Sequence, residues 1–146
     1  MGGENGPVGQ KIYQIVNAME SRAKAIGCDM RKGQPTPGNI AGGLSSIEEK
    51  SLGAIVKSGT KPIQGVLEYT DRITDQKGLW IKDTPGREPE ILTGMAATGA
   101  QVLMFSTGRG APQGFCSMPV IKICGNPITS ARRSHDMDLN AGRIIT

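Results

Sequence analysis

Apolar positions near the start of the chain recur at helical spacing. This spacing predicts a helix over residues 11–26, and Gly27 ends it. A Gly-rich lead, residues 1–10, precedes the helix and is interpreted as a linker. The apolar positions on the predicted helix face are Ile12, Ile15, Val16, Met19 and Ala23.

Three further segments have helix signals. Ser45 or Ser46, followed three residues later by a Glu, forms a capping box that predicts a helix running to about residue 58. Residues 89–99 and 128–135 are predicted as two more helices. The stretch 30–43, which is rich in Pro and Gly, is predicted as a loop.

Short apolar runs without alternation predict buried strands at residues 79–82, 101–106 and 120–124. A loop containing Gly or Asp follows each run and leads toward the next segment. This order favours a single α/β domain with a mainly parallel sheet and flanking helices, in a Rossmann-like three-layer arrangement. Ligands of such sheets bind outside the carboxyl ends of the strands, so we expect the loops beginning at Asp83, Thr107 and Gly125 to meet at one edge.

Composition narrows the classes of protein. The 146 residues include 21 Gly and 9 Pro but only one Trp, two Tyr and two Phe, which argues against a long helical bundle and against an aromatic platform for nucleic acid. A hydrophobic content of 37% and a net charge of +4 argue against disorder. The absence of a long apolar run predicts a cytoplasmic protein that does not enter a membrane, and the three Cys are expected to be reduced, buried or half-buried thiols.

Two loops hold candidate chemistry. Arg109 lies between two glycines, a setting that suits bidentate binding of a carboxylate, although a solvated loop arginine is the alternative. Asp83 follows a predicted strand and is either a turn cap or a metal ligand or proton acceptor.

The densest titratable cluster is His135, Asp136 and Asp138. Mixed nitrogen and oxygen ligands suit a divalent cation, and a histidine suits a general base near neutral pH. A solvated helix end explains the same residues equally well, because side chains two positions apart on a helix do not face each other.

Five sequence blocks follow one another along the chain: TPGNIAGGLSSIEEKSLGAIVKSG, GLWIKDTPG, FSTGRGAPQG, MPVIKICGNP and DMDLNAG. In this order they resemble the C-terminal region of the altronate/galactarate dehydratases, the UxaA family. The resemblance covers residues 33–144, and sulfolactate sulfo-lyase large subunits share part of the pattern. Family members are longer, so residues 11–146 are interpreted as a C-terminal domain truncated at both ends.

The resemblance implies a hydro-lyase that removes the proton α to a carboxylate, expels the β-hydroxyl and yields a 2-keto-3-deoxy acid. It also implies dependence on Fe(II) or Mg(II). A non-catalytic structural domain and a sulfo-lyase are the alternatives. We expect two partners, a small-molecule sugar acid and the upstream domain of the same enzyme. Self-association into a homo-oligomer is a further alternative. We expect the chain to bind neither nucleic acid nor a membrane.

Roles for individual residues follow from the same resemblance. Arg109 would bind a substrate carboxylate, and the catalytic candidates are Asp83, Asp136 and Lys50. Asp138, together with Asp136, is the candidate metal ligand, whereas His135 departs from the family block. The remaining substrate-binding candidates are Thr107, Gly108, Gly110 and Asn39.

Overall fold

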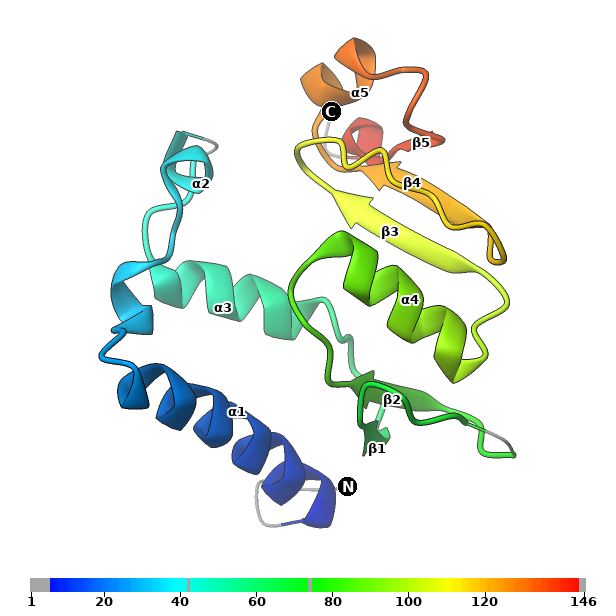
Figure 1. Ribbon diagram of the computed structural model, residues 1–146. Helices are drawn as coiled ribbons and strands as arrows, with labels where there is room; N and C mark the ends of the chain where they lie inside the picture. Colours follow the sequence, from blue (N-terminus) through cyan, green and yellow to red (C-terminus); the bar gives the residue numbers. More distant parts are fainter. Residues whose placement is uncertain (1–5, 42, 74, 145–146) are drawn as a thin grey trace. The chain divides into compact units, whose positions relative to one another are not determined.

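A computed structural model describes residues 6–41, 43–73 and 75–144 (Figure 1). The single predicted domain divides into two compact units: unit 1 holds residues 1–66 and 77–81, and unit 2 holds residues 67–76 and 82–146. Residues 1–5 of the predicted Gly-rich lead lie outside the described part of the chain. No helix in the described part is both long enough and apolar enough to cross a membrane.

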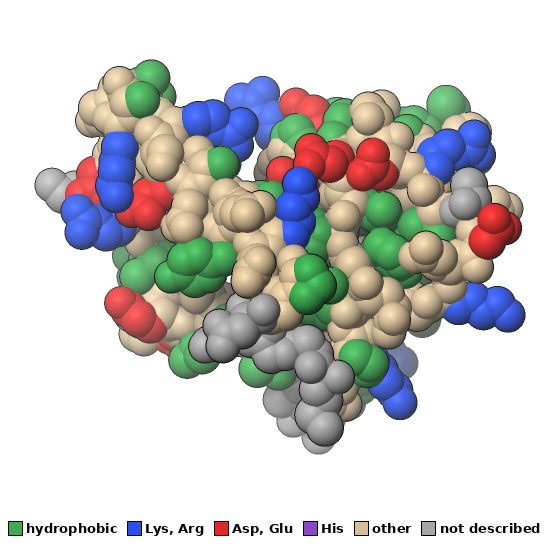
Figure 2. Space-filling model, turned by 90° about the horizontal axis from the view of Figure 1, so that it is seen from below, with side chains coloured by type: hydrophobic (Ala, Val, Ile, Leu, Met, Phe, Trp, Pro, Cys, Tyr) green, Lys and Arg blue, Asp and Glu red, His purple; other side chains and the backbone are tan. Residues whose placement is uncertain are grey.

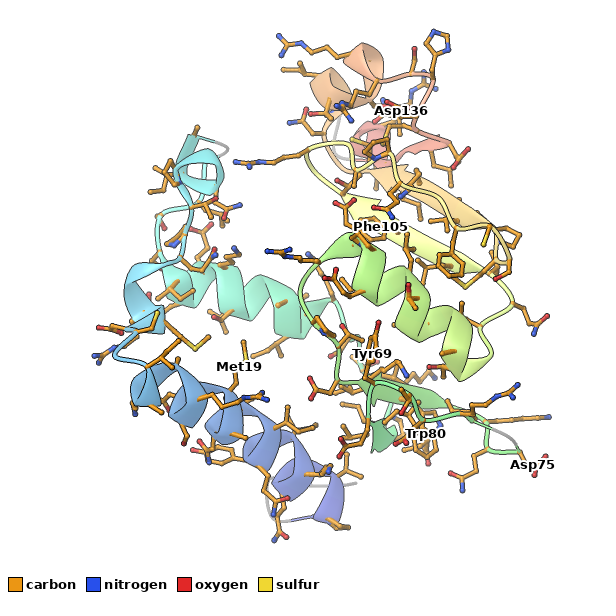
Figure 3. All side chains as sticks on the ribbon, in the orientation of Figure 1. Met19, Tyr69, Asp75, Trp80, Phe105 and Asp136 are labelled. Atoms are coloured by element: carbon orange, nitrogen blue, oxygen red, sulfur yellow. The ribbon has the colours of Figure 1, made fainter. Side chains whose placement is uncertain are left out.

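Unit 1 begins with helix α1 (Pro7–Ala25), which starts four residues earlier than predicted. Pro7 occupies the first turn, where its fixed φ suits the helix and its missing N–H costs nothing. None of the residues of α1 is buried. Val16 and Met19 on its apolar face are exposed, and so is Tyr13 beside that face (Met19 is labelled in Figure 3).

The predicted loop at residues 30–43 contains two short helical segments, so that prediction was wrong in part. A 3-10 turn, η1 (Met30–Lys32), is followed by α2 (Pro37–Ala41). Thr36 and Asn39 cap the start of α2 reciprocally: the Asn39 N–H donates to Thr36 Oγ1 at 3.3 Å and the Thr36 N–H donates to Asn39 Oδ1 at 3.1 Å. Polar side chains that satisfy the free N–H groups of a first turn allow a helix in a sequence rich in Pro and Gly.

Helix α3 (Ile47–Val56) is confirmed, and the structure selects one of the two predicted caps. Ser46 is the N-cap, and its Oγ accepts the N–H of Glu49 at 3.2 Å. The Glu49 carboxylate in turn accepts the N–H of Ser45 at 2.9 Å, so the two side chains satisfy two N–H groups at the helix start. The hydrogen bonds from Ser45 lower the pKa of Glu49.

A two-stranded sheet pairs β1 (Ile63–Leu67) with β2 (Leu79–Lys82). Strand β1 was not predicted, because Gln64 and Gly65 interrupt its apolar pattern. Gly65 is required by packing: a Cβ there would lie 2.2 Å from Cζ3 of the Trp80 ring (Trp80 is labelled in Figure 3).

Unit 2 contains helix α4 (Glu88–Thr98) and a three-stranded sheet formed by β3 (Leu103–Thr107), β4 (Val120–Cys124) and β5 (Leu139–Asn140). Both strand pairs are parallel, as predicted. Helix α5 (Pro127–Arg132) connects β4 to β5, and the 3-10 helix η2 (Ala141–Ile144) follows (Figure 1).

Two predictions about this fold need correction. The strands of the described residues form two separate small sheets, so the Rossmann-like three-layer arrangement is not seen there. Helix α5 ends at Arg132 rather than at residue 135, which leaves His135 and Asp136 in a turn.

The buried apolar side chains of the described residues are few, and they lie in unit 2: Leu67, Leu92, Met118 and Cys124. Tyr69 joins α4 to this core, because its hydroxyl donates to the Glu90 carbonyl at 2.6 Å and its ring fills the space beside Gly94. All three cysteines are free, but only Cys124 is buried, so the prediction of buried or half-buried thiols was wrong for Cys28 and Cys116.

Candidate functional site

The carboxyl ends of β3, β4 and β5 form one edge of the parallel sheet. Thr107, Cys124 and Asn140 lie side by side in the strand register at this edge. We call the segments that begin there, residues 107–111, 124–126 and 140–142, the carboxyl edge. Two of the three predicted loops therefore meet, but Asp83 follows β2 in the other sheet and does not belong to this edge.

Thr107 organises the loop after β3. Its Oγ1 accepts three backbone N–H groups, from Arg109 at 3.3 Å, from Gly110 at 3.0 Å and from Ala111 at 3.3 Å. These bonds curl residues 107–110, the TGRG loop, into a tight turn. A hydroxyl that accepts in this way still has one proton to donate, so Thr107 keeps the capacity to bind a ligand oxygen.

Gly110 is buried at the base of the TGRG loop and has a positive φ of 79°. Its N–H donates to Thr107, and its carbonyl accepts a hydrogen bond from Arg133 Nη1. The backbone of Gly110 is thus engaged within unit 2, whereas Gly108 and Arg109 are exposed. Arg109 is therefore the charged group that this loop presents to solvent.

The predicted pair His135 and Asp136 lies in the turn after α5, and both residues are exposed (Asp136 is labelled in Figure 3). Asp136 Oδ2 lies 3.8 Å from Arg133 Nη1 in an ion pair. Sequence reasoning missed Arg133, because nothing in the local pattern distinguishes it from its neighbour Arg132.

Asp138, the other candidate metal ligand, joins β5 to β4. Its carboxylate accepts the Lys122 N–H at 2.7 Å, and its own N–H donates to the Lys122 carbonyl at 3.0 Å. Within residues 6–41, 43–73 and 75–144, no group of three or more His, Cys, Asp or Glu side chains is placed to hold a metal ion. The described residues therefore do not fit an Fe(II) or Mg(II) site within this chain, and the metal dependence stays a prediction.

Lys122 is a buried charged residue that sequence reasoning missed. Its side chain is 4% exposed, and its Nζ lies 4.4 Å from the centroid of the Phe105 ring (Phe105 is labelled in Figure 3). Nζ has no hydrogen-bond partner among the described residues. Burial lowers the pKa of Lys122, and the carboxylates of Glu88 and Asp138 oppose that shift. The available signal was a lysine inside the apolar run Val120–Cys124.

Two predicted residues of unit 1, Asn39 and Lys50, are brought together by the structure. Lys50 Nζ donates to Asn39 Oδ1 at 3.0 Å and also donates to Gln34 Oε1. Asn39 Oδ1 additionally accepts the hydroxyl of Thr36 at 2.9 Å. The two amide oxygens orient the Lys50 amine.

Asp83 begins the segment after β2, where its N–H donates to the Leu67 carbonyl at 2.9 Å. The neighbouring Lys82 folds over the turn before it, because Nζ donates to the carbonyls of Glu68 at 3.1 Å and Asp71 at 3.4 Å. Burial lowers the pKa of Lys82. Asp83 is half-buried, and its role stays a prediction.

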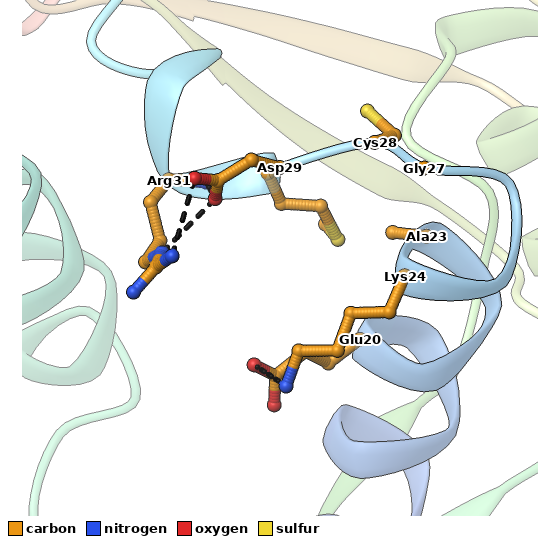
Figure 4. A pocket seen from close by; sticks show the side chains of 8 residues that line it. Glu20, Ala23, Lys24, Gly27, Cys28, Asp29 and Arg31 are labelled. Carbon is orange, nitrogen blue, oxygen red and sulfur yellow. Dashed lines mark hydrogen bonds and ion pairs between the residues drawn. The ribbon is translucent and has the colours of Figure 1, made fainter.

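Unit 1 also has a hollow beside the end of α1, lined by eight residues (Figure 4). Its charged side chains are paired: Lys24 with Glu20 at 2.7 Å and Arg31 with Asp29 at 2.9 Å. Hydrogen bonds from Lys24 and Arg31 lower the pKa values of Glu20 and Asp29, respectively. Paired charges in an open hollow give a ligand little to bind, so the carboxyl edge is the stronger candidate.

The face drawn in Figure 2 has Lys and Arg side chains mixed with Asp and Glu side chains. Such a face attracts anions only weakly over a distance, because the charges of opposite sign offset one another.

A family model described as D-galactarate/altronate dehydratase, C-terminal, matches residues 3–146. The chain belongs to this family. The match confirms the resemblance that the five sequence blocks indicate, and it extends further toward the start of the chain than residue 33.

Curated relatives of the family agree with this assignment. The chain is 40% identical to the altronate dehydratase of Bacillus subtilis over 108 residues, which are 74% of this chain and 21% of that protein. It is 38% identical to the (2R)-sulfolactate sulfo-lyase subunit beta of Chromohalobacter salexigens over 137 residues, 93% of this chain and 34% of that subunit. It is 37% identical to the galactarate dehydratase (L-threo-forming) of Escherichia coli over 142 residues, 97% of this chain and 27% of that enzyme.

The three relatives named above are lyases, and two of them are dehydratases of sugar acids. The chain spans between 21% and 34% of the length of these relatives. The described residues thus correspond to one region of a larger type of enzyme.

Proposed function

We propose that this chain is the C-terminal part of a hydro-lyase that dehydrates a sugar acid of the altronate or galactarate type to a 2-keto-3-deoxy acid. The observation that supports this most directly is the exposed Arg109 on the TGRG loop, at the carboxyl edge of a parallel sheet, in a chain that belongs to the dehydratase family. The loop lies where open α/β sheets bind ligands.

Arg109 suits the first step of the reaction. Removal of the proton α to a carboxylate adds a second negative charge to that group in the transition state. A guanidinium that binds the carboxylate through two hydrogen bonds stabilises this charge more than it stabilises the substrate. The hydroxyl of Thr107 and the backbone of Gly108 would bind substrate hydroxyls beside it.

Two proton transfers expel water and leave an enol: a base takes the α-proton, and an acid protonates the departing β-hydroxyl. The enol then tautomerises to the 2-keto-3-deoxy acid. The residues of the carboxyl edge are assigned neither of these roles, and Asp83 and Lys50 stay the catalytic candidates that the resemblance implies. Asn39 and Gln34 orient the amine of Lys50 within unit 1.

Restoration of activity tests this proposal. The chain is assayed for 2-keto-3-deoxy acid formation from galactarate and from altronate, alone and mixed with a family dehydratase that lacks its own C-terminal region, with Fe(II) or Mg(II) added. Turnover in the mixture that Arg109→Ala abolishes supports the proposal. Turnover that is restored equally well by Arg109→Ala would favour the alternative, a non-catalytic structural domain.

A sulfo-lyase is the second candidate, because the chain is 38% identical to the sulfo-lyase subunit over 93% of its length, which is about as similar as it is to the two dehydratases. The substrate would again be an anion with a carboxylate for Arg109, but the leaving group would be sulfite. Release of sulfite from (2R)-sulfolactate by the same mixture, without turnover of either sugar acid, would replace the first proposal with this one.

A further inference from the structure

Arg133 lies at the end of α5 and reaches the base of the TGRG loop. It is the C-cap residue of this helix, and its Nη1 donates a hydrogen bond to the carbonyl of Gly110. This bond joins two segments separated by 23 positions in the sequence. The loop is consequently held from two sides, by Thr107 from within and by Arg133 from α5.

The contact between Arg133 and Gly110 is also close-packed. A Cβ on Gly110 would lie 2.5 Å from Arg133 Cδ and 3.2 Å from Thr129 Cγ2 on the same helix. The positive φ of Gly110 independently favours glycine. The stem of Arg133 therefore occupies the space that a side chain at position 110 would need, so the position of one residue depends on the other.

Asp136 contacts the same nitrogen of the Arg133 guanidinium that bonds to Gly110. Its Oδ2 is 3.8 Å from Arg133 Nη1, and its N–H donates to the Arg133 carbonyl at 2.9 Å. The two side chains are 44% and 43% exposed, so solvent screens the ion pair and it contributes little to stability. The carboxylate of Asp136 is nevertheless placed to influence where Nη1 points.

Arg109 lies between the two fixed points of the loop, one residue before Gly110, and its own N–H is bonded to Thr107 Oγ1. We propose that Arg133 is a positioning residue for substrate binding: it fixes Gly110 and thereby orients Arg109 toward a substrate carboxylate, while Asp136 orients Arg133. This inference rests on the proposed function in its assignment of Arg109. It gives Asp136 a positioning role in place of a catalytic or metal-binding one.

The test compares Arg133→Gln with Arg132→Gln, a matched control that removes the same charge one position earlier. Two quantities are measured on the full 146-residue chain by NMR: the hydrogen-exchange rates of the Gly110 and Ala111 amides, and the Kd for galactarate. We expect Arg133→Gln to speed exchange and raise Kd by about tenfold or more, as for loss of a charge-assisted hydrogen bond. Arg132→Gln should change both by less than about twofold.

A double-mutant cycle isolates the contact itself. Gly110→Ala is made in the wild-type chain and in Arg133→Ala, where Cδ is absent. The strain of a positive φ is the same in both backgrounds and cancels, so only the clash with Arg133 remains as coupling. We expect Gly110→Ala to raise Kd by a smaller factor in the Arg133→Ala background, and equal factors in the two backgrounds would overturn the proposal.

Two milder variants, Asp136→Asn and Arg133→Lys, replace Arg133→Gln if that variant lowers the melting temperature too far for the chain to stay folded. Asp136→Asn should raise Kd by a smaller factor than expected for Arg133→Gln and leave the melting temperature unchanged. An unchanged Kd together with unchanged hydrogen-exchange rates in both variants would overturn the inference. Failure of the wild-type chain to bind galactarate would instead count against the proposed function. The exchange rates of Gly110 and Ala111 would then decide alone whether Arg133 positions the loop.

Discussion

Individual residues at the carboxyl edge have two different roles, because some hold the TGRG loop in place and one is exposed for binding. Thr107 accepts a hydrogen bond from the Gly110 N–H, and Arg133 donates one to the Gly110 carbonyl. Arg109, in contrast, is exposed to solvent. A binding arginine works best on a rigid support, because less conformational freedom is then lost when the ligand arrives.

Replacement of Arg109 tests the binding role. In the restored enzyme we expect Arg109→Ala to lower kcat/KM for a sugar acid by about 100-fold or more, because a bidentate contact to a carboxylate is lost in the transition state. Arg109→Lys should retain part of the activity, since the charge remains and the fork geometry does not. Steady-state kinetics measures both, and an unchanged kcat/KM in Arg109→Ala would refute the assignment.

Lys122 illustrates the opposite case, a charge whose burial works against stability. We expect Lys122→Met to raise the free energy of unfolding at pH 7 by about 1–3 kcal/mol, because a buried amine without a hydrogen-bond partner is replaced by an apolar chain of similar length. Urea unfolding measures this difference. Lys61→Met, at an exposed position, is the control and should change stability by less than about 0.5 kcal/mol.

The same lysine predicts a pH dependence. Burial lowers the pKa of Lys122 in the folded chain, so between that pKa and its ordinary value the unfolded chain binds more protons. The contribution of Lys122 to the free energy of unfolding should therefore rise with pH across this window. Urea unfolding between pH 7 and about 10 should show a smaller rise in Lys122→Met than in the wild type, and identical slopes would contradict the prediction.

At the scale of the element, glycines serve different purposes at different positions. Gly65 in β1 leaves room for the Trp80 ring, whereas Gly53 in the middle of α3 has no atom within 4 Å of where a Cβ would lie. The first is required by packing, and the second only weakens its helix.

Alanine substitutions separate these two purposes. Gly65→Ala should lower the free energy of unfolding by about 1–3 kcal/mol, because the added methyl group overlaps the Trp80 ring. Gly53→Ala should raise it by about 0.5–1 kcal/mol through helix propensity. Thermal or urea unfolding followed by circular dichroism distinguishes the two, and effects of the same sign would contradict the packing argument.

For the molecule as a whole, the comparisons match the chain to one region of longer relatives. It spans between 21% and 34% of its relatives. Large apolar side chains are exposed on α1, for example Val16, and on β3, for example Met104. The exposure on β3 is unusual, because parallel sheets are ordinarily covered on both faces.

Activity is therefore expected to need the rest of such an enzyme. We predict that the chain alone does not form a 2-keto-3-deoxy acid from galactarate or altronate, and that it does so when mixed with a family dehydratase lacking its C-terminal region. A keto-acid assay over a range of mixing ratios measures this. Turnover by the chain alone would show that the described residues hold the complete catalytic machinery.

The sequence by itself determined most of the local elements and the family. Helical spacing, the Ser46–Glu49 cap and the short apolar runs located four helices and three strands, because these signals depend on neighbouring residues. Five ordered blocks were enough to indicate the dehydratase family, and the parallel pairing of β3, β4 and β5 agrees with the predicted α/β class.

Tertiary structure alone decided which polar groups meet. The division of the strands between two sheets removed Asp83 from the carboxyl edge, and the partners of Asp136, Asp138 and Lys122 come from other segments of the chain or from the turn geometry. Sequence spacing cannot supply such information, because a contact across 16 or 23 positions depends on how the strands pair and where a helix ends. For that reason Arg109 was found from its glycine neighbours, whereas Arg133 was found only from its contact with Gly110.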